Sequence, residues 1–552
     1  MSAAPAVFSA IVLCTLNAKY IHASLGLRYL LANMGELRAQ TQLREFTIAR
    51  KPQELVDELL ALNPQVIGFG VYIWNVTQTC EVVRLLKTQQ PCLKIVLGGP
   101  EVSHEVAGQE IVRLADHVIT GWGDVSFPKL CRAMLHGPQP LMKIIAGEQP
   151  PLDQITLPYS EYSEADLAHR VLYVEASRGC PFKCEFCLSS LDKTAWAFDV
   201  DRFLAELEAL YQRGARTFKF VDRTFNLKID ASIRILQFFL DKLQAAAAKG
   251  RPEQGPAPSG GSAAHEVASV GAIFVHFEVI PDHLPDKLKE KIAEFPPGVL
   301  QFEIGIQSFN VEVQQRISRR QDNDKTAKNI SWLVKHSNAH LHTDLIFGLP
   351  GESLQSFAEG FDRLYALKPH EIQLGILKRL CGTPIARHTA EFGMVYDTAP
   401  PYTVQKTNVV SAGEMQRFTR LARYWDLIVN SGRFKQTSAW LMNPANGAPS
   451  AFAAFSQLSD WLWRDTRTTT GLTPERLTDS LHYFLVEERF LLEFHAQAML
   501  LADYLASGAR AKPKVLQGLL TRHAVAADGA SPPVADKGGR LAERQARHRV
   551  SA

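Results

Sequence analysis

The sequence predicts an α/β fold in three parts: an N-terminal Rossmann-like parallel sheet, a central partial (β/α)6 barrel and a helical C-terminal domain. Two observations indicate this arrangement. Short apolar runs alternate with amphipathic stretches over residues 1–136 and again over residues 166–410, which is typical of parallel strands joined by helices. Beyond residue 411 the apolar residues follow a helical pattern instead.

The first predicted domain covers residues 1–136. Its strands are expected at residues 8–16, 43–48, 66–72, 94–97 and 117–120. Amphipathic stretches with helical spacing lie between them, so the strands are expected to run parallel. Doubly wound sheets of this kind bind ligands at the carboxyl ends of their strands, and we expect a ligand site there.

A Pro-rich linker over residues 137–165 leads to the predicted barrel. The barrel strands are expected at residues 171–176, 217–221, 273–279, 300–306, 340–347 and 371–377. Residues 245–264 are rich in Ala, Gly, Pro and Ser and are predicted to be a mobile surface insertion. Active residues of barrels lie at the carboxyl ends of the strands, which directs attention to the segments that follow them.

Residues 411–510 are predicted to form the helical C-terminal domain. This stretch contains many aromatic residues, among them Trp425, Trp440, Tyr483, Phe490 and Phe494. An aromatic stripe at helical spacing is more often core than a substrate platform, so we expect a helical cap that packs on the open barrel. Residues 511–552 are rich in Ala, Gly and Arg and are predicted to be a disordered tail.

Three cysteines lie close together directly after the first barrel strand. Cys180, Cys184 and Cys187 follow the spacing C-x3-C-x2-C, and thiolates are the ligands that iron–sulfur clusters need. A closed structural zinc site needs a fourth ligand, and no second C-x2-C pair or nearby histidine supplies one. The other five cysteines are scattered, which disfavours disulfides. The spacing therefore favours a cluster with three protein ligands and one open iron.

This segment, with Phe186 before the last cysteine, resembles the signature of radical S-adenosylmethionine (SAM) enzymes. The resemblance implies a [4Fe-4S] cluster whose open iron is chelated by SAM. One electron from the cluster then cleaves SAM to a 5′-deoxyadenosyl radical. It also implies an electron donor such as a flavodoxin or a ferredoxin.

Polar residues follow several predicted barrel strands, and part of them resembles the radical SAM branch that includes the oxygen-independent coproporphyrinogen oxidases. By that resemblance, Gln307 and Asp344 approach the SAM ribose, and Arg319 binds its carboxylate, with the adjacent Arg320 as the alternative. The other residues assigned to SAM are Phe186, whose backbone would meet adenine, Glu278, which would contact the amino group, and Asp222. No residue is assigned from the sequence to catalysis of the reaction that follows SAM cleavage.

A Rossmann-like domain directly before such a barrel resembles the cobalamin-binding class of radical SAM proteins. The residues expected to line a corrin site are Tyr72, Trp74, Gly98, Gly99 and Gly121, because glycines let the backbone approach a large planar ligand. Many cobalamin domains carry D-x-H-x-x-G, whose histidine binds cobalt. Here the aspartate is missing before His22 and the glycine is displaced, so we expect no histidine on cobalt.

Several functions remain open at this point. The first is a radical SAM enzyme in which cobalamin carries a methyl group to carbon or phosphorus. The second is radical hydrogen abstraction, rearrangement or oxidation without methyl transfer, and the third is a cofactor-binding sensor without turnover. The net charge of +3 offers no argument for nucleic acid or a membrane surface, and no apolar run reaches about 18 residues. Free thiols and an oxygen-sensitive cluster lead us to expect a cytoplasmic protein.

Overall fold

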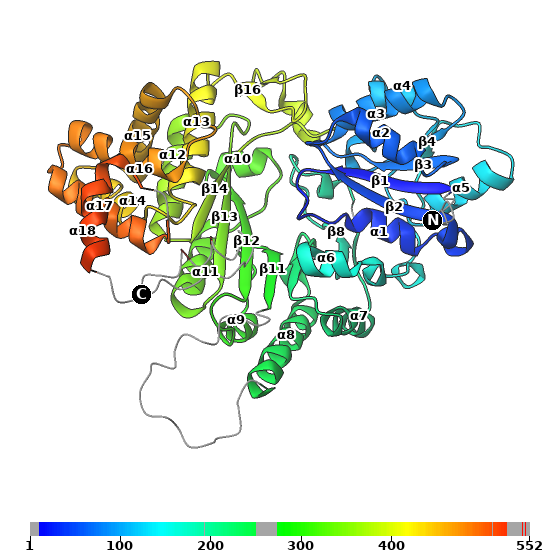
Figure 1. The fold of residues 1–552 in the computed structure, drawn as a ribbon, viewed down its shortest axis with the longest axis horizontal. Helices are drawn as coiled ribbons and strands as arrows, with labels where there is room; N and C mark the ends of the chain where they lie inside the picture. The colour runs from blue at the N-terminus through cyan, green and yellow to red at the C-terminus, as the bar shows by residue number, and fades with distance from the viewer. Residues whose placement is uncertain are drawn as a thin grey trace.

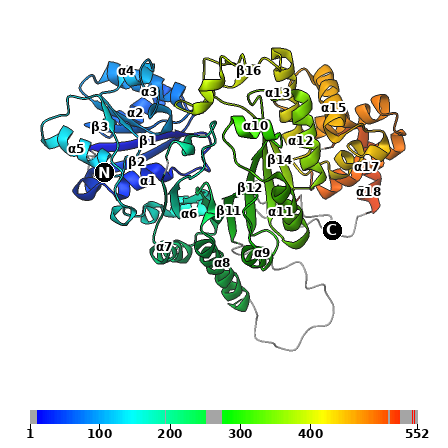
Figure 2. The same cartoon turned by 180° about the vertical axis from the view of Figure 1, so that it is seen from behind.

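The protein is described here by a computed structural model that places residues 10–192, 194–249, 273–509, 512–526, 544 and 547. The three parts lie side by side, with the barrel between the N-terminal sheet and the C-terminal helices (Figures 1 and 2). In the described part of the chain, no helix is long and apolar enough to cross a membrane.

The N-terminal domain is a parallel sheet of six strands in the order β2-β1-β3-β4-β5-β6. Its strands are β1 Ile11–Asn17, β2 Thr41–Thr47, β3 Val66–Gly70, β4 Lys94–Gly98, β5 His117–Thr120 and β6 Ile144–Ala146. Its helices are α1 Leu25–Ala32, α2 Pro52–Leu60, α3 Val76–Gln89, α4 Glu110–Leu114 and α5 Ser126–His136. Apolar clusters fill both faces of the sheet, which is why its central strands β1, β3 and β4 are mostly apolar.

Strand β6 corrects the prediction of a linker over residues 137–165. It pairs in parallel with β5, although it is only three residues long and partly exposed. A strand of three residues is too short to show an alternating pattern in the sequence. The high proline content of residues 137–165 therefore indicated a linker instead. Further along the same stretch, helix α6 Glu164–His169 begins at a capping box formed by Ser163 and Asp166.

The barrel is an open parallel sheet in the order β14-β13-β12-β11-β10-β7. Its strands are β7 Leu172–Val174, β10 Thr217–Phe220, β11 Phe274–Val279, β12 Leu300–Gln307, β13 His340–Phe347 and β14 Glu371–Ile376. Its helices are α7 Val200–Gln212, α8 Ile229–Lys249, α9 Asp286–Ala293, α10 Val311–Arg316, α11 Asn323–His336 and α12 Leu354–Ala366. Side-chain caps at Asp199, Asp322 and Ser353 begin α7, α11 and α12.

Two further pairs of strands lie outside these sheets. Strands β8 Ser177–Gly179 and β9 Ala195–Ala197 form an antiparallel hairpin, and β15 Val395–Tyr396 pairs with β16 Val404–Lys406. Residues 245–249 of the predicted insertion continue α8 as helix, because Ala-rich sequence suits a helix. Its remaining residues lie outside the described part of the chain.

The C-terminal domain is helical and shares one apolar core with the barrel. Its helices are α13 Ala412–Ile428, α14 Lys435–Leu441, α15 Ala451–Thr466, α16 Pro474–Tyr483, α17 Glu493–Ala506 and α18 Gln517–Ala526. Trp425 is 1% exposed and donates a 2.8 Å hydrogen bond from Nε1 to the Ile372 carbonyl of β14. Phe418 stacks on Phe347 of β13 at 4.1 Å between ring centroids. The helices therefore cap the barrel through aromatic side chains.

Not all the aromatic residues of this domain are core. Tyr483, Phe490 and Phe494 are exposed on the surface instead. The tail predicted to be disordered from residue 511 is also corrected over its first part, because residues 517–526 form α18. Leu516, directly before this helix, is buried in the shared core, which explains why the chain stays ordered there.

Candidate active site

The three cysteines lie in the loop that joins β8 to β9, directly after the first barrel strand. Each of Cys180, Cys184 and Cys187 is partly exposed. Gly179 has φ +83°, and a Cβ at this position would collide with the carbonyl of Thr194, the residue before β9. The hairpin therefore needs glycine before the first cysteine.

The surroundings of the thiols fit an iron–sulfur cluster. Burial raises the pKa of Cys180, and the nearby thiols of Cys187 and Cys184 raise it further. The three sulfurs are therefore close enough to interact electrostatically. Arg319 Nη1 lies 3.6 Å from Cys184 Sγ and stabilises its thiolate. Among the described residues, no three His, Cys, Asp or Glu side chains converge on a single metal ion. A [4Fe-4S] cluster does not need three side chains that converge on one metal ion, because each cysteine thiolate binds a different iron.

Glu185 anchors the cysteine loop to the segment that leads into the C-terminal domain. Its carboxylate is 3% exposed and accepts hydrogen bonds from Ser318 Oγ at 2.6 Å, from His388 Nε2 at 2.9 Å and from Arg387. The Glu185 carbonyl also accepts from the backbone of Ile385 at 3.0 Å. This anchor lies between two of the cysteines, and sequence reasoning missed it because its partners are more than 130 residues away.

Gln307 and Asp344 both present a buried side-chain oxygen without a hydrogen-bond partner, Oε1 and Oδ1 respectively. Gln307 also has φ +70°, a strained conformation for a residue with a side chain, at a shift in register between β12 and β13. Burial, then the charges of Glu303 and Glu278, raises the pKa of Asp344 well above its ordinary value. Unpaired buried oxygens are costly, and a ligand hydroxyl would satisfy them.

Two other residues predicted to bind SAM, Asp222 and Glu278, already interact with neighbouring groups of the protein. The Asp222 carboxylate accepts from Ala176 N at 2.9 Å and Ser177 Oγ at 2.6 Å, so it braces the start of the cysteine hairpin. Burial raises the pKa of Asp222 to about 7. Glu278 Oε1 lies 2.8 Å from Arg223 Nη1, and burial raises the pKa of Glu278.

Arg319 and Arg320 differ in their surroundings. Arg319 is partly buried and donates to the Gly305 carbonyl and to Gln321 Oε1 at 2.9 Å, beside Cys184. Arg320 is exposed. Phe186 is partly buried and packs against the barrel core. The geometry thus favours Arg319 for a ligand on the cysteine loop.

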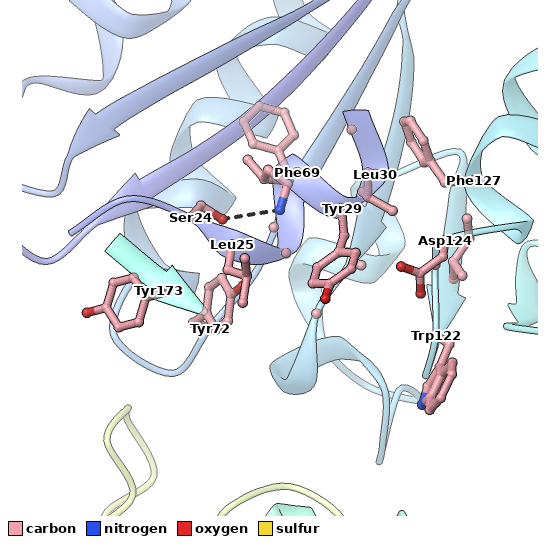
Figure 3. Close-up of a pocket in the computed structure, with 18 of the residues that line it drawn as sticks. Ser24, Leu25, Tyr29, Leu30, Phe69, Tyr72, Trp122, Asp124, Phe127 and Tyr173 are labelled. Carbon is pink, nitrogen blue, oxygen red and sulfur yellow. Dashed lines mark hydrogen bonds between the residues drawn. The ribbon is translucent and has the colours of Figure 1, made fainter. Parts of the chain in front are cut away.

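A cavity of about 760 Å³ separates the N-terminal sheet from the barrel. Its walls come from the carboxyl ends of β1, β3, β4 and β5 and from the hairpin side of the barrel, including Gly179 and Asp192. Figure 3 shows Tyr29, Asp124 and Trp122 around this space. The volume is within the range of about 300–1,000 Å³ that is usual for ligand and cofactor sites.

The glycines at the sheet edge leave room for a large ligand. At Gly121 an added Cβ would meet no atom within 4 Å, and at Gly98 the nearest would be 3.8 Å away. Gly99 has a different role, because it has φ +107° and a Cβ there would lie 2.5 Å from the Val71 carbonyl oxygen. All three line the cavity. The observed space and the small residues on its floor fit a corrin ring.

Tyr72, Trp74 and His22 line the same cavity from the loops after β3 and β1. The Tyr72 and Trp74 rings stack at 4.4 Å between centroids, with Trp74 45% exposed. His22 Nδ1 lies 2.7 Å from the hydroxyl of Tyr173 on β7, and burial lowers the pKa of His22. The structure therefore places His22 at the cavity wall with one ring nitrogen already engaged.

Comparisons with known proteins agree with this arrangement. A family model described as B12 binding domain matches residues 11–131, and one described as Radical SAM superfamily matches residues 174–364. The chain thus contains a B12-binding domain and a radical SAM domain. A third model, Protein of unknown function (DUF4080), matches residues 390–528. The radical SAM domain implies a [4Fe-4S] cluster and SAM, and the B12-binding domain implies cobalamin.

Two curated relatives are methyltransferases. The 2-(S-pantetheinyl)-carbapenam-3-carboxylate methyltransferase of Streptantibioticus cattleyicolor is 24% identical over 56% of this chain and 46% of its own length. The cobalamin-dependent radical SAM methyltransferase TokK of Streptomyces tokunonensis is 24% identical over 59% of this chain and 48% of its own. The chain thus spans less than half the length of these relatives. The radical SAM family and these relatives indicate an enzyme.

Two solved structures confirm the predicted fold class. TsrM from Kitasatospora setae, a radical SAM methyltransferase solved with cobalamin and a [4Fe-4S] cluster, has a TM-score of 0.54 and 15% identity. The match covers 74% of this chain and 85% of TsrM. The cobalamin-dependent SAM radical enzyme OxsB has a TM-score of 0.56 and 13% identity, over 98% of this chain and 83% of OxsB.

Proposed function

We propose that this protein is a radical SAM enzyme that uses cobalamin to transfer a methyl group to carbon or phosphorus. The observation that carries the proposal is the shared wall of the cavity. Gly179 and Asp192, which flank the cysteine loop, line the same space as Gly98 and Gly121 at the edge of the B12-binding sheet. A substrate between the two domains would therefore meet both cofactor sites.

In this proposal Cys180, Cys184 and Cys187 bind three irons of the cluster. Arg319 binds the SAM carboxylate by a two-pronged, charge-assisted hydrogen bond, because it is the partly buried arginine beside Cys184. Gln307 and Asp344 accept hydrogen bonds from the ribose hydroxyls through Oε1 and Oδ1, which accept no hydrogen bond within the protein. Glu278 and the backbone of Phe186 contact the amino group and adenine, while Asp222 supports the hairpin from beneath.

Tyr72, Trp74, Gly98, Gly99 and Gly121 form the proposed corrin site. The glycines admit the ring to the sheet edge, and the stacked Tyr72 and Trp74 rings close one side. When bound, the cluster supplies the electron that cleaves SAM, and cobalamin carries the methyl group. The chain's own part is to hold the corrin in the cavity and to place the cysteine loop, whose flanking residues Gly179 and Asp192 line that cavity, directly beside it.

Radical SAM enzymes need a reductant and a substrate. We propose a flavodoxin or a ferredoxin as the reductant, in keeping with a cluster that accepts single electrons. We also propose that the protein works in the cytoplasm, because its eight cysteines are free thiols, as in reducing compartments.

The test uses full-length protein reconstituted anaerobically with iron and sulfide, supplied with SAM that carries a labelled methyl group and with a cell extract of small molecules. We expect label in a carbon- or phosphorus-bound methyl product only when cobalamin is present. Label that appears equally without cobalamin would contradict the proposed methyl carrier.

The second candidate is radical hydrogen abstraction without methyl transfer. The cavity is compatible with it, since OxsB, which has the same fold over most of the chain, is described as a cobalamin-dependent SAM radical enzyme rather than a methyltransferase. In that case SAM would yield 5′-deoxyadenosine while the labelled methyl group stayed on the released methionine. A sensor without turnover would consume no SAM at all.

A further inference from the structure

Arg178 joins the cysteine hairpin to the B12-binding domain. It lies on β8, two residues before Cys180, and its guanidinium reaches the loop between β5 and α5. There it makes two hydrogen bonds to the Asp124 carboxylate, Nη1 to Oδ2 at 2.8 Å and Nη2 to Oδ1 at 3.1 Å. Nε donates to Glu175 Oε2 at 3.1 Å. One side chain thus binds carboxylates from both domains.

This ion pair is nearly dry. The side chains of Arg178 and Asp124 are 11% and 6% exposed. The guanidinium also lies over the rings of Tyr29 at 4.3 Å and Trp122 at 4.8 Å. A planar guanidinium that is paired twice and stacked has little freedom to move, so the loop and the hairpin are held in one relative position.

A second contact connects the same two loops. Trp122 Nε1 donates to Asp192 Oδ2 at 3.0 Å, and Asp192 lies at the far end of the cysteine loop. Its carbonyl accepts from Cys180 N at 3.5 Å. Trp122 also meets Trp196 of β9 edge-on at 5.7 Å between centroids. Both ends of the cysteine loop are therefore tied to residues 121–124.

Residues 121–124 also line the cavity where the corrin is proposed to bind. A ligand that contacts this loop stabilises the arrangement in which Asp124 and Trp122 hold the hairpin. The same arrangement positions Cys180 for the cluster. We propose that Arg178 is a positioning residue that couples the two cofactor sites, so that occupancy of the cluster and SAM site tightens binding of the corrin. The inference rests on the proposed function.

The coupling is measured as a ratio of affinities rather than as an affinity. Hydroxocobalamin is titrated anaerobically into full-length protein, followed by its visible absorbance, once without the cluster and once with cluster and SAM. The wild-type protein is expected to bind about fivefold or more tightly in the second state, the lower end of typical coupling between sites. A purely structural role would change both affinities and leave their ratio unchanged.

Four variants probe the contact. Arg178→Gln and Asp124→Asn each remove the charged pair and are expected to bring the ratio close to one, while Arg178→Lys restores it in part. Trp122→Phe removes the donor to Asp192 but keeps an aromatic ring beside Arg178, and it should lower the ratio less. Asp124→Asn keeps the shape of the side chain, so the ratio of affinities can still be measured in this variant if Arg178→Gln fails to fold.

The matched control is Arg379→Gln. Arg379 Nη2 binds both oxygens of Glu105 at 3.0 Å and 2.9 Å, so it also joins the B12-binding domain to the end of the barrel, but outside the cavity. Its loss should leave the ratio at the wild-type value. If Asp124→Asn and Arg178→Gln keep the wild-type ratio, the coupling role of Arg178 is refuted, while the proposed function still stands. A wild-type protein that binds no hydroxocobalamin overturns the proposed cofactor and the inference with it.

Discussion

The cavity at the edge of the N-terminal sheet is lined mainly by apolar side chains and glycines, and Arg178 and Asp124 in its wall are paired with each other, whereas the carboxyl edge of the barrel carries charged and amide groups. The first region offers space and few polar atoms, which suits a large ligand held by its shape. The second offers polar groups, and the buried oxygens of two of them accept no hydrogen bond in the described structure, which suits a small polar ligand. The two sites should therefore be sensitive to different substitutions. Binding at the barrel edge should be lost when a side chain that contacts the ligand is removed, and binding at the sheet edge should be lost when a larger side chain fills the cavity.

The largest effect is expected from the cysteine loop. Cys180→Ala, Cys184→Ala or Cys187→Ala should each abolish the iron–sulfur absorption of anaerobically reconstituted protein, because each removes the thiolate of one iron. Iron content and the visible spectrum measure it. Cys92→Ala, at an exposed cysteine outside the loop, is the control and should keep the cluster. A triple alanine variant that still bound four irons would refute the assignment.

The next effect is expected at Arg319. Arg319→Ala should weaken SAM binding by roughly 10- to 150-fold, the equivalent of about 1.5–3 kcal/mol for a hydrogen bond to a charged group. Equilibrium dialysis with labelled SAM measures it, and the iron content should stay unchanged. Arg320→Ala is the matched control, since that side chain is exposed. If Arg320→Ala lost affinity instead, the carboxylate site would have been assigned to the wrong arginine.

Much of the fold could be predicted because most strands contain apolar residues in runs or in alternation: β1 begins with an apolar run at residues 11–14, and β12 alternates buried apolar residues with polar ones. The hairpin of β8 and β9 could not, because Ser177, Arg178 and Gly179 show no strand periodicity and the pairing is fixed by the loop they enclose. Strand β6 was missed for the same reason. Short strands gain their stability from neighbours that the local sequence does not reveal.

The candidate site shows the same limit. The cysteine spacing predicted one loop, and the polar residues after β12 and β13 predicted a shared edge, because parallel strands bring their carboxyl ends together. Arg178 and Asp124 are 54 residues apart, and Glu185 and His388 are 203 apart, so no local pattern connects them. Contacts between domains depend on docking, which a single sequence does not encode in its spacing.

A smaller effect is expected from filling the space at the sheet edge. Gly98→Leu introduces a side chain where the nearest atom to an added Cβ is 3.8 Å away, so the domain should fold while the cavity shrinks. Hydroxocobalamin binding should weaken about tenfold, the equivalent of about 1.4 kcal/mol, because the leucine side chain occupies space that the corrin would take, and SAM binding should not change. Gly137→Ala, outside the cavity, is the control. Unaltered cobalamin affinity would place the corrin elsewhere.

No effect is expected from His22→Ala, which makes it the sharpest test of how the corrin is held. The histidine lines the cavity, but the pattern that supplies a cobalt ligand is broken around it, and its Nδ1 is already engaged by Tyr173 at 2.7 Å. If shape and apolar contact hold the corrin, the substitution should leave both the affinity for hydroxocobalamin and the cobalt absorption spectrum unchanged, as should the control His136→Ala at the end of α5, outside the cavity. A spectrum altered only by His22→Ala would instead show a histidine on cobalt. The sheet edge would then hold its ligand through a specific atom, as the barrel does, and the contrast between the two regions would disappear.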